Sequence, residues 1–144
     1  MNFEEKLRAR FSEVMDEQST FAREWGNKRR EIVEPRMRLA EKVLKERLGG
    51  GVLLDPKNGE ITLFALHEGQ ENFLAFSSDT ERLEVKCSMA SYPKDSKREN
   101  APAEEKLMAL AEITQPIIEE IVMGFAVKVA RGKRQVREAA QPGA

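Results

Sequence analysis

The side chains best suited to catalysis or metal binding are scarce in this chain. It contains one histidine, His67, and one cysteine, Cys87. A single histidine excludes a multi-histidine metal site within one chain, and a cysteine–histidine pair would need Cys87 to approach His67. Val85, Cys87 and Met89 alternate with polar residues, so Cys87 is one of a series of apolar side chains. This pattern is typical of a buried cysteine rather than of a nucleophile. We therefore expect no catalytic residue and no metal site.

Glycine-rich and acidic segments do not supply a site either. Gly49–Gly51 follows a helical pattern and precedes a strand pattern, the reverse of the order in a phosphate-binding loop. The segment Asp55–Gly59 is interpreted as a turn, because Lys57 stands where a calcium loop needs a carboxylate or an amide. Glu119 and Glu120 are neighbours on a predicted helix, so their carboxylates point about 100° apart. We expect no nucleotide or other cofactor, and a protein that is not an enzyme.

Length and charge bound the fold and the environment. The 144 residues correspond to one domain, and 24 basic against 25 acidic side chains leave a net charge of −1. No overall field draws such a chain to nucleic acid or to a membrane, and its longest apolar stretch is far too short for a membrane span. A single cysteine excludes an intrachain disulfide, and the first five residues lack the basic and apolar regions of a signal peptide. We expect a cytoplasmic protein.

Two helices are predicted before the glycines at 49–51. Apolar residues recur at alternating steps of three and four, which is typical of one amphipathic stripe. Pro35 lacks a backbone donor and disfavours helical geometry at the preceding residue, so we place one helix at 3–33 and another at 35–48. The stripe of the first helix consists of Leu7, Phe11, Val14, Phe21, Trp25 and Ile32.

A period of two replaces the helical period over the next forty residues. Turn formers separate β-branched and aromatic runs, which predicts strands at 52–55, 60–67, 72–78 and 81–92. The helical period returns over 103–131, with a kink near Pro116, and 132–144 are expected to form a flexible tail. The prediction is a single α+β domain over residues 1–131. It has a long N-terminal helix broken near Pro35, a four-stranded antiparallel meander covered on one face, and a long C-terminal helix.

The difference in length between the first helix and the strands is the basis for predicting self-association. A helix of about 30 residues spans ~45 Å, whereas a strand of about seven residues spans ~23 Å, so the first helix must extend past its own sheet. Its apolar stripe continues along the overhang. Another helix has to cover it, either the C-terminal helix of the same chain or a copy from a second chain. We expect a homodimer that associates through the stripe of residues 3–33.

Two classes of function remain open on the sequence alone. The missing catalytic groups and the long helices favour a protein-interaction or chaperone-like assembly module that holds a protein partner through its helix stripes and a sheet edge. The alternative is a domain that binds a small apolar ligand between the sheet and the C-terminal helix. Nucleic-acid binding ranks last, because the basic clusters have only Trp25 as an aromatic residue for stacking. The predicted ligand pocket consists of Phe64, Leu66, Phe76, Ile121 and Phe125.

Overall fold

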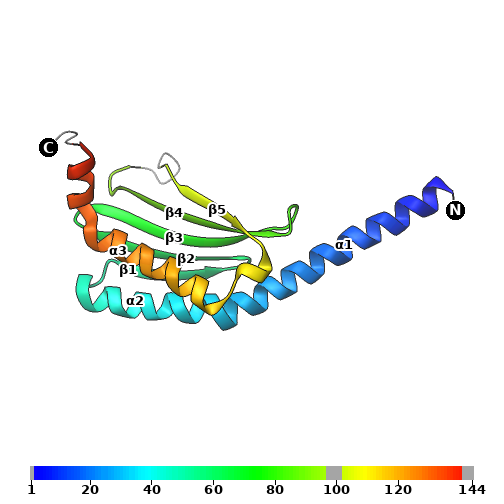
Figure 1. Cartoon of the computed structure of the whole chain (residues 1–144), viewed down its shortest axis with the longest axis horizontal. Coiled ribbons are helices and arrows are strands. Elements are labelled where there is room, and N and C mark those ends of the chain that lie inside the picture. Colours follow the sequence, from blue (N-terminus) through cyan, green and yellow to red (C-terminus); the bar gives the residue numbers. More distant parts are fainter. Residues whose placement is uncertain (1, 97–101, 141–144) are drawn as a thin grey trace.

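Two consecutive helices, an antiparallel sheet and a C-terminal helix make up the fold (Figure 1). The computed structural model describes residues 2–96 and 102–140, with side chains described as far as Gly132. The predicted α+β class is confirmed. The elements are α1 (Phe3–Lys28), the π-helical turn η1 (Arg29–Val33), α2 (Glu34–Leu48), β1 (Val52–Lys57), β2 (Glu60–His67), β3 (Gln70–Asp79), β4 (Glu84–Pro93), β5 (Glu104–Met108), the 3-10 turn η3 (Leu110–Glu112) and α3 (Gln115–Ala140).

The sheet is a meander in which each strand pairs with its neighbour in sequence, in the order β1-β2-β3-β4-β5. All of these pairs are antiparallel. Between β2 and β3 the chain reverses through Glu68 and Gly69, both at positive φ, as a tight two-residue hairpin turn requires. The register aligns Ile61 of β2 with Phe76 of β3 and, through it, with Cys87 of β4. Aligned residues share a face, so this row fixes one face of the sheet.

Both α2 and α3 lie on that face, and the main core forms between them and the strands (Figure 1). Fully buried side chains from the helices, such as Met37 and Phe125, pack there against Leu63 and Phe76. The opposite face has no helix over it in Figure 1. It carries a smaller cluster in which Phe64 and Tyr92 pack against Phe73, Ala75 and Ala90.

The predicted helix over 103–131 is wrong for its first part. Residues 104–108 form β5, an edge strand paired with β4, so the sheet has five strands rather than four. The spacing of Leu107 and Leu110 imitates a helical stripe, yet Met108 is the buried side chain of this segment. An edge strand depends on hydrogen bonds to a partner strand elsewhere in the chain. The spacing of apolar residues within the segment carries no information about that partner.

The C-terminal helix is correspondingly shifted. α3 begins at Gln115 and has Pro116 in its first turn, where the missing N–H of proline has no helical acceptor. Helical backbone continues to Ala140 past Gly132, whose φ of 45° and ψ of −132° interrupt it. A β-carbon at Gly132 would lie 3.2 Å from the side chains of His67 and Glu68, and the positive φ of Gly132 is a conformation that favours glycine. Of the predicted tail 132–144, residues 141–144 lie outside the described residues.

The helix does not break at Pro35, where two separate helices were predicted. The five residues Arg29–Val33 form a π-helical turn that joins α1 to α2, and Pro35 lies in the first turn of α2. Within this turn the N–H of Glu34 donates to the carbonyl of Arg29, one residue further back than in an α-helix. The chain therefore stays helical from residue 3 to residue 48 and only bends at the π-helical turn (Figure 1).

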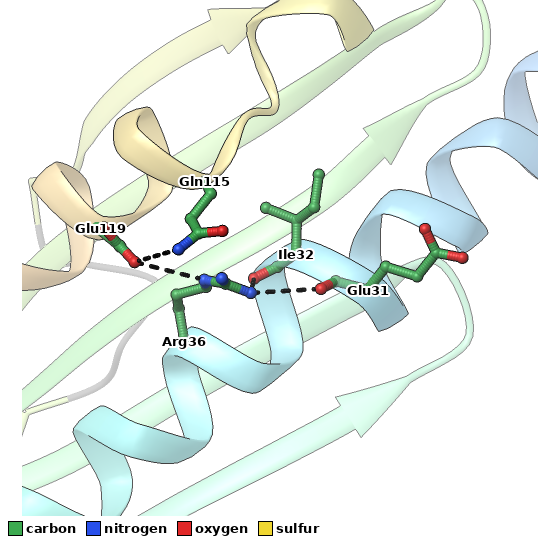
Figure 2. Close-up of polar contacts among 5 residues, drawn as sticks. All are labelled: Glu31, Ile32, Arg36, Gln115 and Glu119. Carbon is green, nitrogen blue, oxygen red and sulfur yellow. Dashed lines mark hydrogen bonds and ion pairs between the residues drawn. The ribbon is translucent and has the colours of Figure 1, made fainter.

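The Arg36 side chain replaces the hydrogen bond that proline cannot make. In an α-helix the residue at position 35 would donate to the carbonyl of Glu31, and proline has no N–H for it. Arg36 Nη1 donates to that oxygen at 3.3 Å and to the Ile32 carbonyl at 3.5 Å (Figure 2). Its Nε lies 3.7 Å from the Glu119 carboxylate on α3, which also accepts from Gln115 at 3.0 Å. One guanidinium thus supports the π-helical turn and ties it to α3.

Replacing Arg36 should therefore cost more stability than replacing a surface arginine. We expect Arg36→Met to lower the free energy of unfolding by about 1–2 kcal/mol, because carbonyls in a half-buried turn lose their donor. The matched control is Arg38→Met, which removes an exposed ion pair with Glu34 on the same helix and should change stability by less than about 0.5 kcal/mol. Urea unfolding followed by circular dichroism measures both, and equal losses would contradict the role assigned to Arg36.

Candidate protein-interaction site

The first turns of α1 project beyond the sheet, and no other element of the described part of the chain lies beside them (Figure 1). We name residues 3–17 the arm. Along it Phe3, Leu7, Phe11 and Met15 follow one another at steps of four, with exposed fractions of 78%, 56%, 66% and 51%. The Asn2 side chain caps the first turn by accepting a hydrogen bond from the Glu5 N–H at 2.8 Å. The arm is thus a well-formed helix that presents a continuous apolar stripe to solvent, and such patches mark interaction surfaces.

The second half of α1 is fixed to one end of the sheet by hydrogen bonds to loop carbonyls. The buried Trp25 indole donates to the carbonyl of Gly59 in the β1–β2 turn at 3.1 Å. Lys28 Nζ donates to the carbonyl of Leu110 at 2.8 Å, and the Gln18 amide donates to a carbonyl in the β3–β4 turn at 3.3 Å. Three segments far apart in the sequence therefore hold the base of the arm, so the direction of the arm is set by the body.

The residues predicted to self-associate fall into two groups. Phe21 and Trp25 are buried in the core of the chain itself, and Ile32 packs against that core. The stripe is therefore covered internally where it meets the sheet and uncovered beyond it. The part that remains for a partner comprises Leu7 and Phe11 with the half-buried Val14, together with Phe3 and Met15, which the alternating spacing did not single out.

A groove with a volume of about 510 Å³ lies at the base of the arm. Its apolar lining comes from Phe21 on α1, from Leu83 at the β3–β4 turn and from Leu110 in η3. Sequence reasoning missed this groove because its walls come from three distant segments. Only the density of carboxylates on α1 could have drawn attention to it. The remaining lining residues, all on α1, are Glu13, Asp16, Glu17, Thr20 and Glu24.

The basic residues of the arm, Lys6, Arg8 and Arg10, lie between the acidic first turn (Glu4 and Glu5) and Phe11, and only carboxylates follow Phe11. The charges separate clearly only on one flank of the stripe. At about 100° per residue, Lys6 and Arg10 lie on the same flank of the stripe as Glu13, and Arg8 lies on the opposite flank. Arg10 Nη1 is 3.0 Å from Glu13 Oε2, and this hydrogen bond, with the nearby Glu13 and Glu17 charges, raises the pKa of Arg10. The groove side of the arm is thus basic towards its tip and acidic towards its base.

The residues predicted to line a ligand pocket do not surround one cavity. Phe76 and Phe125 are fully buried in the main core, and Ile121 packs against it. The register places Phe64 and Leu66 on the opposite face of the sheet. Side chains separated by the sheet cannot share a ligand.

A second hollow, also of about 510 Å³, lies between β4, β5 and α3 and is lined in part by Cys87 and Ile121. Burial raises the pKa of the Cys87 thiol to about 11, so the side chain is a neutral core thiol rather than a nucleophile. His67 Nε2 lies 3.8 Å from Glu68 Oε1 at the β2–β3 turn, remote from the arm. Within residues 2–96 and 102–132, no three histidine, cysteine, aspartate or glutamate side chains gather as a metal site would require.

The Cys87 thiol should consequently be unreactive in the folded protein. At pH 8 we expect alkylation by iodoacetamide to be slow under native conditions and fast in denaturant, since only unfolding exposes the sulfur and lowers its pKa towards the ordinary value of 9.0. Because the folded pKa is the higher one, this group contributes stability below pH 9 that is lost as the pH rises towards 11. Rapid native alkylation at pH 8, measured by mass spectrometry, would contradict the burial.

The first basic cluster surrounds Pro35 and comprises Lys28, Arg29, Arg30, Arg36 and Arg38. Lys28 and Arg29 donate to backbone carbonyls of Leu110, Lys57 and neighbouring loop residues, and Arg36 supports the π-helical turn. These guanidinium and ammonium groups are therefore engaged within the chain and do not present a row of free cations to phosphates. The second basic cluster comprises Lys128, Arg131, Lys133, Arg134 and Arg137, and the side chains of its last three members lie outside the described ones.

Comparison with known proteins gives no relative, because no protein-family model, no curated protein and no solved structure matches the chain. No helix in the described part of the chain combines the length and hydropathy needed to cross a membrane. The physical features of the arm and the groove are therefore the basis for any statement about function.

Proposed function

We propose that this protein is an interaction and assembly module that binds another protein chain through the arm, and that a second copy of the chain is the partner, giving a homodimer. The observation that carries the proposal is the projecting helix with Phe3, Leu7, Phe11 and Met15 exposed along one side. A helix of this kind needs a cover, and the described body of the chain supplies one only from Gln18 onwards.

Burial of the exposed stripe offers an apolar gain comparable to the cost of association. Complete burial of one large apolar side chain contributes ~1.5–3 kcal/mol, and each of these four is only partly buried now, so roughly 1–2 kcal/mol per side chain remains to be gained. Four side chains from each of two copies give roughly 10 kcal/mol. The loss of translational and rotational freedom costs about 4–15 kcal/mol. Because the arm is already helical, ordering adds little further cost, and the apolar gain is of the same size as the cost of association.

Charged substitutions in the stripe should therefore dissociate the protein. We expect the wild-type chain to sediment as a dimer at micromolar concentrations, and Leu7→Glu/Phe11→Glu to weaken the dimer by at least tenfold, about 1.4 kcal/mol, because carboxylates would be buried in an apolar interface. Sedimentation equilibrium measures both. Since neither side chain contacts the core, circular dichroism and the unfolding midpoint should stay near wild type.

Two controls isolate the stripe from general surface effects. Ala9→Glu places the same charge on the exposed opposite side of the arm, and Leu39→Glu places it on an equally exposed apolar residue of α2. Both variants should remain dimeric. A wild-type chain that stays monomeric at the highest soluble concentration, or a dimer that survives Leu7→Glu/Phe11→Glu, would refute self-association through the arm.

A further inference from the structure

The groove at the base of the arm and the tip of the arm are complementary in both polarity and charge. The groove has an apolar floor, which includes Phe21 and Leu83, and it has carboxylates along its α1 side. The tip carries Phe3 beside basic residues on the same flank. From this complementarity we infer that the groove receives residues 3–10 of a second copy, so that the two arms pair antiparallel. This inference rests on the proposed self-association and specifies its geometry.

The apolar residues fit an antiparallel pair centred on Phe11. In that register Phe11 faces Phe11 of the second copy, and Leu7 lies beside Met15 of the second copy. Phe3 of the second copy then reaches the level of Ser19, next to Thr20 and Phe21 of the groove lining. All four exposed residues of each stripe therefore gain apolar neighbours.

The charges select the same orientation. A two-fold axis perpendicular to the helices keeps each flank of one arm beside the same flank of the other. Lys6 and Arg10 of the second copy consequently lie along the flank that carries Glu13 and Glu17. A parallel pair would instead bring the Lys6 and Arg10 flank against the flank that carries the Glu4–Arg8 ion pair of the second copy, and it would place no cation beside Glu13 and Glu17. Opposite charges at matched positions therefore favour the antiparallel arrangement.

The ion pairs within the free arm do not prevent this exchange. Arg10 pairs with Glu13 across one turn, and both side chains are 60% or more exposed. Such exposed pairs contribute little to stability and reorganise readily. Association can therefore replace contacts within one arm by contacts between arms while the helix itself stays intact.

Charge reversal tests the groove separately from the stripe. We expect Lys6→Glu/Arg10→Glu and Glu13→Lys/Glu17→Lys each to raise the dimer dissociation constant at least tenfold in sedimentation equilibrium. An equimolar mixture of the two variants should form a heterodimer with affinity close to that of wild type. Arg8→Glu, on the opposite flank, is the matched control and should change the dissociation constant by less than threefold.

Cysteine cross-linking tests the orientation. Leu7→Cys and Met15→Cys are prepared separately, with the buried Cys87 left in place. Under mild oxidation the mixture should give a disulfide-linked heterodimer in high yield, whereas each variant alone should cross-link weakly. Efficient cross-linking of each variant with itself would show parallel pairing and would overturn the inference.

The same measurements distinguish a failure of self-association through the arm from a failure of the groove assignment alone. If the wild-type chain is monomeric, self-association fails and the groove assignment fails with it. If the wild-type chain dimerises and Leu7→Glu/Phe11→Glu dissociates it, but neither charge reversal has any effect, the arm is the interface and the groove assignment alone is refuted.

Discussion

The continuity of the helix across Pro35 determines where everything else lies. A proline normally ends a helix because it removes a donor and clashes with the preceding turn. Here the π-helical turn absorbs the misfit, and Arg36 supplies the donor that the Glu31 carbonyl would otherwise lack. Residues 3–48 consequently form one helical column of roughly 69 Å, whereas the longest strands, of ten residues, span only about 33 Å. The column must extend past the sheet.

Hydrogen bonds at the end of the sheet fix the direction of the projecting part of this column, the arm. Backbone carbonyls at this end need donors, and Trp25 and Lys28 of α1 and Arg29 of η1 provide them. Each bond reaches a different residue, so the helix is held against rotation as well as displacement. A helix of about fifteen residues is marginal on its own in water. Continuity with a fixed helical base removes the nucleation cost, which explains how the arm can be helical before any partner covers it.

The sequence predicted the elements better than it predicted what covers them. The apolar stripe of α1 is visible in the sequence as a helical period. Leu7 and Trp25 both belong to this period, yet Leu7 is exposed and Trp25 is buried. The difference between them is the position of the sheet end, which is a property of the fold and not of the helix. The same limit explains β5, whose partner strand is remote, and the ligand pocket, because a face is assigned only once the register aligns Phe64 with Phe73 rather than with Phe76. By contrast, the charge blocks at 6–10 and 13–17 were readable from the sequence and were overlooked.

Preorganisation and charge order act on different parts of association. An arm that is already helical loses little conformational freedom on binding, so most of the apolar gain of its stripe is available for affinity. An apolar stripe is nevertheless indifferent to direction, since a parallel and an antiparallel partner cover similar area. On its groove side the arm is basic towards the tip and acidic towards the base. The basic part of one arm meets the acidic part of the other only when the two arms run antiparallel, so the charges select that orientation. Affinity thus arises from the stripe, whereas orientation arises from the charges that flank it.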